Sequence, residues 1–277
     1  MTPGPAVHRF ASAHALGANV ALVDLEDSVA PKQKPEARRA ARQFLSGEST
    51  STLGVRINAP ATRDGAADLL ALTEYPNRPE LVLVPKVETA RDIEFVSSLL
   101  DETEYRPELY AIVETPRAFT NLADIFAASR LGGVFFGSAD YAGLMACGIG
   151  WNAMLFARAA LVNSATAAGV PAIDSPFFDL DDPAGLLREC EQAKDLGFDG
   201  KGAVHPKQLP VINKVFAPTP AELDHARAVV AAGHETGRNI VTVDGKMIGA
   251  PFFAAAAALV EQADLEEGNR RMSEFTK

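Results

Sequence analysis

Two carboxylate residues each follow an apolar run, at the point where the run ends. Glu114 comes directly after the run at 109–113, and Asp140 lies just beyond the run at 133–136. A carboxylate at the edge of an apolar interior costs several kcal/mol unless it is compensated. Neighbouring carboxylates repel each other, and a hard divalent ion such as Mg²⁺, which prefers oxygen ligands, would compensate both. A separate salt bridge for each acid is the alternative on spacing alone, although no lysine or arginine is placed to neutralise both.

Further polar residues follow other apolar runs. Arg56 ends a run in GVRINAP, where its planar guanidinium suits a carboxylate or a developing enolate oxygen beside a metal. An ion pair with Glu26 or Asp27 is the alternative for Arg56. Glu26 and Asp27 would form an acidic outer shell that orients metal-bound water. Gly137, beside Asp140, supplies backbone amides that would hold a small carboxylate.

Three other reactive residues are expected to have ordinary roles. His205 is followed by Pro206, and we expect a hydrogen-bonded structural role for it. Lys86 lies among acidic residues, which favour a protonated side chain over a Schiff base. Cys147 has no evident histidine partner, and the sequence contains no Gly-x-Ser-x-Gly motif.

Apolar runs that alternate with helical patterns position these residues. The runs start about 30 residues apart, the length of one βαβ unit. Runs that are apolar on both faces indicate a parallel sheet covered by helices on both sides. The runs lie at 20–25, 54–57, 81–85, 109–113, 133–136, 171–174 and 202–204, and the helical patterns at 35–45, 90–100, 117–129, 152–168 and 183–196.

The sequence therefore predicts a TIM-type (β/α)8 barrel, in which active sites lie at the carboxyl ends of the strands. Polar residues directly after the runs are expected to face one common mouth. They are Glu26, Asp27, Arg56, Asn58, Lys86, Glu88, Glu114, Ser138, Asp140, Asp174, Ser175 and His205.

The composition narrows the class of protein. The 277 residues carry a formal net charge of −10, and no basic run stands out, which argues against nucleic acid and anionic membranes as partners. The chain has two cysteines outside any CxxC pattern, which suits a reducing cytosol. No apolar stretch reaches membrane-spanning length. We therefore expect a cytoplasmic protein that acts on small molecules.

Six ordered motifs resemble a known family. They are VALVDLEDSVAPKQKPEARRAA, GVRINAP, LVLVPKVET, AIVETPRAF, GSADYA and GFDGKGAVHPKQ. In order and spacing they resemble the citrate lyase β-subunit-like branch of the HpcH/HpaI aldolase superfamily, over residues from about 2 to 260. The resemblance implies a TIM barrel with magnesium at the strand ends. It also implies cleavage or formation of a carbon–carbon bond between an acyl-CoA or acyl-thioester and a 2-oxo acid.

The resemblance also implies roles for individual residues and an assembly. Glu114 and Asp140 would be the metal ligands, and Arg56 would polarise the reacting oxygen. The chain would divide into a barrel at 1–215 and a C-terminal helical segment at 216–277 that packs on a neighbouring subunit of a homotrimer or homohexamer. Residues that order metal-bound water or hold the oxo-acid carboxylate would be Glu26, Asp27, Gly137, Ser138 and Ala139.

The sequence departs from the family pattern in two places. The family begins with a strand of the type RSxLFVP, whereas this chain reads MTPGPAVHRF, so we expect the first strand to be missing or truncated. A misassigned start codon and an edge opened between strands 8 and 2 are the two explanations. The family motif DGKMID carries an acid/base aspartate, but this chain reads VDGKMIGAP, with Gly249 in that place. Asp244, five residues earlier, would point elsewhere.

The leading hypothesis is a Mg²⁺-dependent carbon–carbon lyase in which the metal chelates the carboxylate and adjacent oxygen of a 2-hydroxy acid. One alternative is an aldolase that releases pyruvate or a similar oxo acid without CoA, using water or His205 as base. Another is a catalytically silent homologue that binds metal and oxo acid, which the first strand and Gly249 both favour.

Overall fold

The computed structural model describes residues 1–236 and 239–275 of the chain. The chain divides into two compact units, residues 1–216 and residues 217–277. Gly249 and Asp244 lie in the second unit, and the other residues considered above lie in the first. That the second unit packs on a neighbouring subunit stays a prediction.

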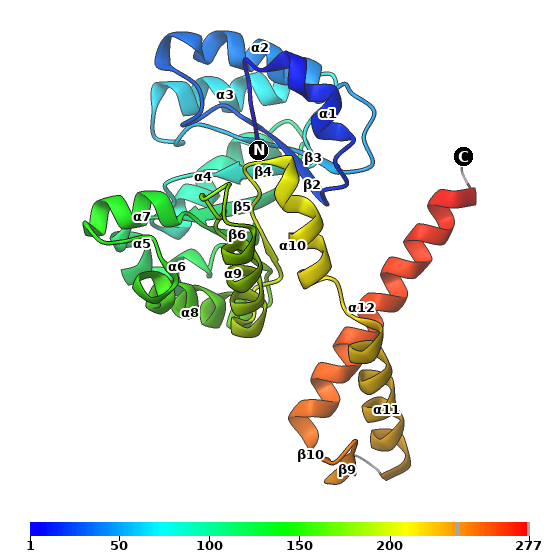
Figure 1. Cartoon of the computed structure of the whole chain (residues 1–277). Coiled ribbons are helices and arrows are strands. Elements are labelled where there is room, and N and C mark those ends of the chain that lie inside the picture. The colour runs from blue at the N-terminus through cyan, green and yellow to red at the C-terminus, as the bar shows by residue number, and fades with distance from the viewer. Residues whose placement is uncertain (237–238, 276–277) are drawn as a thin grey trace. The chain divides into compact units, whose positions relative to one another are not determined.

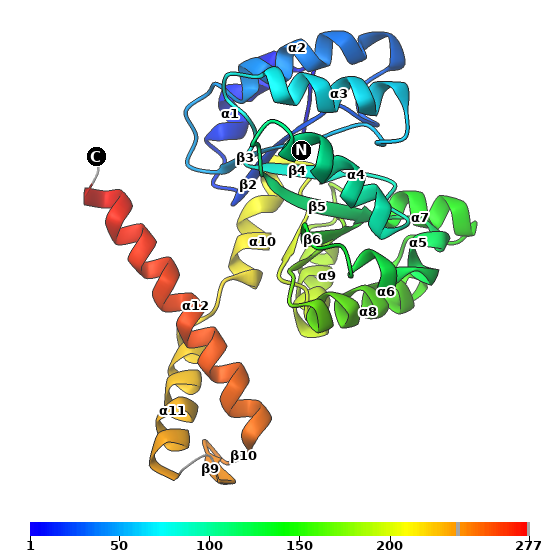
Figure 2. The ribbon, with the colours of Figure 1, turned by 180° about the vertical axis from the view of Figure 1, so that it is seen from behind.

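Parallel strands in sequential order form the sheet of the first unit, and helices lie on the outer side of this curled sheet (Figures 1 and 2). The predicted TIM-type barrel is confirmed, with a first strand truncated to two residues. The eight strands are β1 (Thr2–Pro3), β2 (Val20–Asp24), β3 (Thr52–Arg56), β4 (Leu81–Val84), β5 (Glu108–Val113), β6 (Leu131–Phe136), β7 (Ala172–Asp174) and β8 (Gly200–Lys201).

The two edges of the sheet are β1 and β8, which do not pair with each other in the part of the chain that the structure describes. The Met1 amino group donates a hydrogen bond of 3.2 Å to the carbonyl oxygen of Ala203, just beyond β8. This hydrogen bond links the two edges, whereas a ladder of backbone hydrogen bonds joins each pair of neighbouring strands in the sheet.

The last strand was predicted at 202–204, and this prediction is wrong, because β8 ends at Lys201. The backbone N–H of Gly202 still donates to the carbonyl oxygen of Asp174, at 2.9 Å, and the chain then leaves the sheet. His205 caps the short 3₁₀ helix η3 (Pro206–Gln208). The strand was misplaced because the polar Lys201 does not look like part of an apolar run.

Helices follow the strands around the first unit. The helix predicted at 117–129 is split, because Asn121 has a non-helical φ of −117° and its side-chain amide donates to the carbonyl oxygen of Glu88, at 3.1 Å. Among all described residues, no helix combines the length and apolar character that crossing a membrane requires. The helices are α1 (Phe10–His14), α2 (Lys34–Phe44), α3 (Arg63–Glu74), α4 (Ala90–Asp101), α5 (Pro116–Thr120), α6 (Leu122–Ile125), α7 (Ser138–Met145), α8 (Trp151–Ala168), α9 (Pro183–Leu196) and α10 (Leu209–Phe216), with the 3₁₀ helices η1 (Val7–Arg9) and η2 (Pro31–Gln33).

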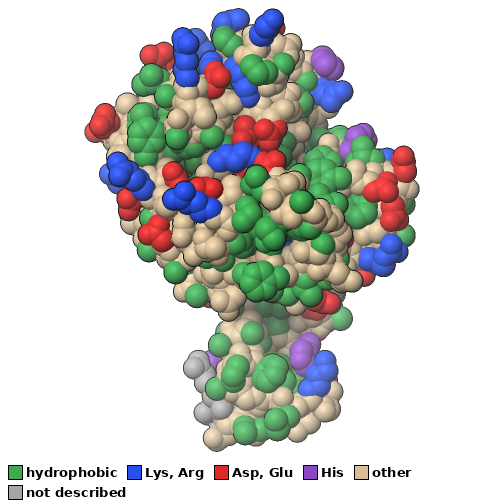
Figure 3. All heavy atoms as spheres, turned by 90° about the vertical axis from the view of Figure 1, so that its left-hand side faces the viewer, with side chains coloured by type: hydrophobic (Ala, Val, Ile, Leu, Met, Phe, Trp, Pro, Cys, Tyr) green, Lys and Arg blue, Asp and Glu red, His purple; other side chains and the backbone are tan. Residues whose placement is uncertain are grey.

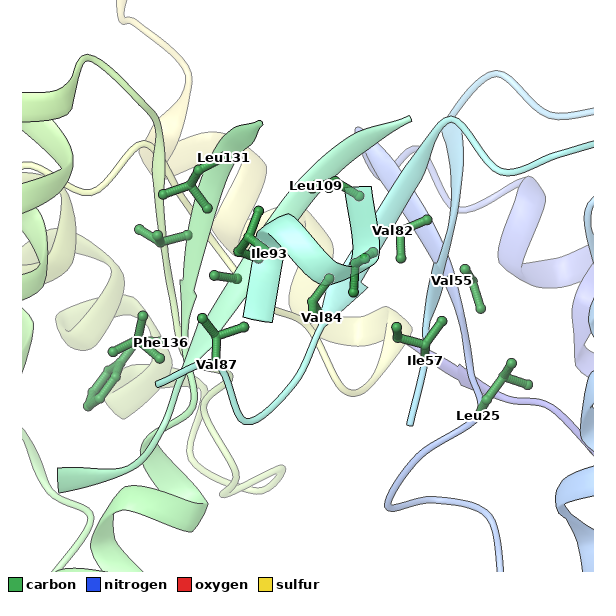
Figure 4. Close-up of a cluster of buried hydrophobic side chains, with 14 of the residues drawn as sticks. Leu25, Val55, Ile57, Val82, Val84, Val87, Ile93, Leu109, Leu131 and Phe136 are labelled. Atoms are coloured by element: carbon green, nitrogen blue, oxygen red, sulfur yellow. The ribbon is translucent and has the colours of Figure 1, made fainter. Parts of the chain in front are cut away.

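Apolar side chains alternate along the strands between two cores. On β4, Val82 and Val84 face the outer helices, whereas Leu81 and Leu83 belong to a separate cluster inside the barrel. Figure 4 shows the outer layer, in which Val82 and Val84 lie near Ile93 of α4. Each such buried side chain stabilises the fold by about 1.5–3 kcal/mol. The same alternation decides which side chains at the strand ends face the barrel interior.

The second unit is a pair of helices with a β-hairpin between them. Ala226, Val229 and Phe253 form part of its small core. Asp244 and Gly245 have φ values of +48° and +75°, as a two-residue hairpin turn requires. The elements are α11 (Pro220–Thr236), β9 (Val241–Val243), β10 (Lys246–Ile248) and α12 (Ala250–Phe275).

The negative charge of the chain is spread among basic side chains. On the face shown in Figure 3, acidic side chains lie beside lysine and arginine side chains, next to a broad area of apolar ones. The formal net charge of −10 is therefore not gathered into one acidic surface on this face.

Candidate active site

Three charged side chains at strand ends point into the mouth of the barrel. Asp24 ends β2, Arg56 ends β3, and Glu114 directly follows β5. Glu114 lies two residues after Ile112, which belongs to the interior cluster, so the alternation along the strand turns both side chains the same way. Because carboxyl ends of neighbouring parallel strands meet at one edge, the three groups lie close together.

Glu114 is almost completely buried, with 3% of the residue exposed. The backbone N–H of Lys86 donates to Glu114 Oε1 at 2.8 Å, and Lys86 Nζ lies 3.3 Å from the same oxygen. Burial raises the pKa of Glu114, and the contacts with Lys86 oppose this shift without cancelling it. The buried carboxylate is therefore compensated by Lys86 in this structure.

The position of the Glu114 side chain depends on the absence of a side chain at Gly137. A Cβ atom at Gly137 would lie 2.3 Å from Glu114 Cβ and 2.5 Å from Glu114 Oε2. Non-bonded contacts of a Cβ atom are essentially never this short, so Glu114 would have to move. The glycine in GSADYA is thus required for the close approach of β6 to the buried acid.

Asp140 lies in the first turn of α7, and its side chain is 36% exposed. Lys86 Nζ contacts the Asp140 carboxylate as well as Glu114, and so joins the two acids. The expectation that no lysine neutralises both acids is therefore wrong. It failed because the sequence shows where Lys86 lies along the chain but not how its backbone turns after β4.

Arg56 is held by an aspartate that the sequence did not single out. Arg56 Nε and Nη2 donate to the two carboxylate oxygens of Asp24, at 2.7 and 2.6 Å. Burial raises the pKa of Asp24, but Arg56 and the Ser28 hydroxyl lower it further, so it lies below its ordinary value. The remaining guanidinium nitrogen, Nη1, lies 3.0 Å from Glu26 Oε2 and 3.7 Å from Asp27 Oδ2.

Glu26 is a buried acid without full compensation. Its Oε2 has no hydrogen-bond partner among the described residues, because the nearby Arg56 Nη1 lacks hydrogen-bond geometry. Lys86 Nζ lies 3.9 Å from its other oxygen. Burial, assisted by Glu114 and Asp27, raises the pKa of Glu26 to about 7. Glu26 can therefore take up or release a proton near neutral pH.

A buried lysine holds the segment that carries Glu26. Lys34 Nζ donates to the carbonyl oxygens of Leu25 and Glu26, at 2.8 and 2.6 Å, and to Asn58 Oδ1 at 2.6 Å. Asn58 in turn donates to the buried carboxylate of Asp68. This network ties the ends of β2 and β3 together and fixes the backbone beside Glu26 and Arg56.

The predicted carboxylate-binding segment forms the start of α7. Gly137 is the N-cap of this helix and supplies no side-chain cap, and Ala139 is exposed. The Ser138 side chain is buried, and its Oγ has no partner among the described residues. A helix N-terminus attracts negative charge, so Gly137, Ser138 and Ala139 can bind a small carboxylate.

The donor set fits a hard divalent ion. Glu114 and Asp140 approach a single positive charge, the ammonium of Lys86. Two carboxylates suit Mg²⁺, which retains coordination positions for water and substrate. In the residues that the structure describes, no three carboxylate, histidine or cysteine side chains form a preassembled metal cluster. The protein would therefore supply two ligands at most from this set.

Other predicted residues have structural roles. His205 Nδ1 accepts a hydrogen bond from the Lys207 N–H at 3.1 Å, in agreement with its expected role. Asp174 does not face the mouth as expected, because its neighbour Ile173 packs on the interior cluster and Asp174 points outward to Arg158.

Asp244 and Gly249 both lie in the second unit, outside the barrel unit that carries the other candidate residues. Asp244 Oδ2 lies 2.7 Å from His225 Nδ1, within the second unit. Among the described residues, a Cβ at Gly249 would meet only Ile240 Cγ1, at 3.9 Å, so these residues leave room for a side chain there.

Comparison with known proteins identifies the family. The profile of HpcH/HpaI aldolase/citrate lyase matches residues 3–206, and that of a C–C bond lyase of the TIM-barrel fold matches residues 159–265. The chain is 35% identical over 256 residues to a (3S)-malyl-CoA thioesterase of Cereibacter sphaeroides, which covers 89% of this chain and 87% of the relative.

Solved structures agree. CitE from Mycobacterium tuberculosis, in complex with magnesium, acetoacetate and coenzyme A, has a TM-score of 0.79 at 31% identity, covering 95% of this chain and 96% of that one. The citrate lyase β subunit of the same organism, complexed with oxaloacetate and magnesium, has a TM-score of 0.69 at 32% identity, covering 78% and 94%. The resemblance found in the six motifs is confirmed, and the chain belongs to the HpcH/HpaI aldolase/citrate lyase family.

Proposed function

We propose that this protein is a Mg²⁺-dependent carbon–carbon lyase that cleaves or forms the bond between an acyl-CoA thioester and a 2-oxo acid. The observation that carries the proposal is the convergence of Glu114 and Asp140 on one positive charge, in the same barrel mouth as Arg56. The malyl-CoA relative, and the solved neighbours with magnesium, coenzyme A, acetoacetate or oxaloacetate, support this substrate class.

Glu114 and Asp140 would hold the metal ion. Bound there, Mg²⁺ would act as a Lewis acid and as a template for the carboxylate and adjacent oxygen of the substrate. The start of α7 would bind the substrate carboxylate through its free backbone N–H groups and the Ser138 hydroxyl, which has no partner among the described residues.

Arg56 would stabilise negative charge on the reacting oxygen. Its plane is fixed by the two hydrogen bonds to Asp24, so no reorganisation is needed when charge develops. Glu26 Oε2 is a suitable acceptor for the hydroxyl proton of the substrate, because the pKa of Glu26 lies at about 7. The electron pair of the broken bond would pass to the α-carbon of the thioester, which leaves an enolate and a 2-oxo acid.

The enolate must then be protonated, and here the chain lacks the aspartate of the family motif. Gly249 has no side chain that could donate a proton. Loss of a general acid typically lowers the rate 10²- to 10⁴-fold. We therefore expect slow turnover, with water as the proton donor.

Thioester hydrolysis is a second candidate. The 35% identical relative is named a thioesterase. A carboxylate with a pKa of about 7, such as Glu26, can also activate a water molecule for attack on a thioester.

Cleavage of citramalyl-, malyl- and citryl-CoA in the presence of Mg²⁺ tests the proposal, with free thiol and 2-oxo acid measured in parallel. A lyase releases the oxo acid together with an acyl-CoA, whereas a thioesterase releases free CoA thiol. Glu114→Gln and Asp140→Asn are expected to abolish turnover. Glu94→Gln, which neutralises an exposed acid on α4, is the matched control and should retain it.

Three results would replace the proposal. Thiol release without oxo acid would establish hydrolysis. Turnover of 4-hydroxy-2-oxo acids without any CoA ester would indicate a CoA-independent aldolase. Magnesium-dependent binding of oxaloacetate by calorimetry, with no turnover of any thioester, would indicate a silent homologue.

A further inference from the structure

Lys86 lies where the proposed metal ion would bind. Its Nζ contacts the carboxylates of Glu114 and Asp140 and lies 3.9 Å from Glu26 Oε1. We propose that Lys86 is an internal counter-cation of this site: its ammonium group neutralises the acids while the metal is absent, and Mg²⁺ binds by displacing it. This inference rests on the proposed function, because it assumes that Glu114 and Asp140 bind the metal.

The backbone of Lys86 is held in a conformation that serves this role. Lys86 has a φ of +56°, in the left-handed region that residues with a side chain rarely adopt. In this conformation its N–H donates to Glu114 Oε1, the same oxygen that its Nζ approaches at 3.3 Å. Strained residues of this kind persist when surrounding contacts enforce them, and they concentrate at functional sites.

The ammonium group and the metal exclude each other. Mg²⁺ sits about 2.0–2.1 Å from its ligand oxygens, and an ammonium group in contact with the same oxygens occupies that space. A lysine ammonium next to a divalent cation is also repelled by it. Binding therefore requires Lys86 Nζ to leave, and the side chain, which is 34% exposed, can move into solvent at the mouth.

A positive charge at Lys86 offsets the repulsion among the acids at the mouth. Glu26 and Glu114 are buried acids, and Lys86 Nζ lies 3.9 Å from an oxygen of Glu26 and 3.3 Å from an oxygen of Glu114. Without a cation, the mouth would hold facing carboxylates that repel one another. Lys86 thus stabilises the metal-free protein and weakens metal affinity by the same contacts.

The competition between Lys86 and Mg²⁺ can be tested on the full-length chain by titration calorimetry with MgCl₂ at pH 8, together with thermal melting without metal. Lys86→Met is expected to bind Mg²⁺ about fivefold more tightly than the wild type, because an ion pair worth about 1 kcal/mol no longer competes. Without Mg²⁺, Lys86→Met should also have a lower melting temperature than the wild type. Addition of Mg²⁺ should raise its melting temperature by more than it raises that of the wild type. Lys86→Gln provides the same comparison if Lys86→Met folds poorly.

Two variants separate charge from other effects. Lys86→Arg keeps a cation and should bind Mg²⁺ no more tightly than the wild type. Lys214→Met removes the same charge from an exposed position on α10 and should leave Mg²⁺ affinity unchanged.

The inference and the proposed function fail in different ways. If Lys86→Met and Lys86→Gln bind Mg²⁺ as weakly as the wild type or more weakly, while Glu114→Gln abolishes binding, the metal site stands and Lys86 is not its counter-cation. If Lys86→Arg binds as tightly as Lys86→Met, the positive charge is not the cause and the inference is again overturned. If none of these proteins binds Mg²⁺, the proposed metal site itself is wrong.

Discussion

Two arginine–aspartate pairs lie at the carboxyl ends of the barrel strands and look alike in isolation. Arg56 binds Asp24 through Nε and Nη2, at 2.7 and 2.6 Å, and Arg158 binds Asp174 through the same two atoms, at 2.8 and 3.3 Å. In each pair the aspartate is the last residue of a strand. The two pairs differ in what surrounds them.

The Arg158–Asp174 pair belongs to a balanced network between the sheet and the outer helices. Lys201 Nζ lies 2.6 Å from Asp174 and 2.7 Å from Glu189, so two basic and two acidic side chains meet. Arg158 is 1% exposed, and its guanidinium lies 4.6 Å from the ring centroid of Trp151. Charge balance, burial and stacking indicate a structural role, joining β7 and β8 to α8 and α9.

The Arg56–Asp24 pair has an excess of acid around it. Within the described residues, Asp24, Glu26, Asp27, Glu114 and Asp140 gather around two basic side chains, Arg56 and Lys86. One oxygen of Glu26 lacks a hydrogen-bond partner there, and Lys86 is partly exposed. An arginine–aspartate pair at a strand end is therefore not by itself evidence of a functional site. Uncompensated charge that a ligand can reach distinguishes the Arg56 pair from the Arg158 pair.

Removing one cation from the balanced network should give the largest effect. Lys201→Met leaves Asp174 and Glu189 to share Arg158, and unpaired buried charge of this kind costs about 3–5 kcal/mol of unfolding free energy. Urea denaturation should show this loss, while the folded fraction binds Mg²⁺ like the wild type. A loss below about 1 kcal/mol, equal to that of Lys214→Met, would mean that the network is not structural.

The converse change removes an acid from the barrel mouth, in place of a cation from the balanced network: Glu26 is replaced by glutamine. The pKa of Glu26 is about 7 in the folded protein, against 4.5 for an ordinary glutamate. Because the folded pKa is the higher one, the contribution of Glu26 to stability is complete below about pH 4.5 and is lost as pH rises through 7. This loss amounts to roughly 3 kcal/mol.

Glu26→Gln should therefore unfold with a flatter dependence on pH between 4.5 and 8, in metal-free buffer. Asp68, whose pKa burial raises to about 6, contributes a slope of the same sign in both proteins, so the difference between them isolates Glu26. Parallel curves for the two proteins would show that Glu26 is compensated in solution.

Exchanging lysine for arginine in each pair should separate activity from stability. Arg56→Lys loses the fixed two-point contact with Asp24, and we expect kcat to fall about 100-fold, or about 2.7 kcal/mol, with a small effect on unfolding. Arg158→Lys should lower stability and leave kcat nearly unchanged. If Arg56→Lys and Arg158→Lys lower stability equally and lower kcat equally, the two pairs do not have the different roles assigned to them.

The sequence predicts which residues lie at the barrel mouth, because the apolar runs end close to where most of the strands end. Arg56 and Glu114 follow such runs directly, and the order of parallel strands then brings them together. The balanced network was misjudged because position at a strand end does not decide direction. Asp174 points outward because Ile173 points inward, and β7 is only three residues long, too short to show its alternation.

The remaining misses have local causes. Lys86 was not expected to bridge the acids, because nothing in the letters of LVLVPKVET shows its positive φ. Asp24 lies within the apolar run at 20–25, so the pattern does not single it out as a partner for Arg56. Helix α3 was missed because Asp68 lies in its middle with an uncommon buried role, accepting hydrogen bonds from Asn58 and Arg38.

The smallest expected effect comes from a single methyl group at the mouth. Gly137→Ala puts Cβ 2.3 Å from Glu114 Cβ, so the acid must shift, which we expect to cost about 1–3 kcal/mol of stability and to weaken Mg²⁺ binding. Gly143→Ala is the matched control on α7, because its Cβ would meet no described atom within 4 Å. Alanine there should stabilise the helix by about 0.5–1 kcal/mol. Equal Mg²⁺ affinity in both variants would show that the position of Glu114 does not determine Mg²⁺ binding. Metal binding would then not explain the excess of acidic residues around Arg56.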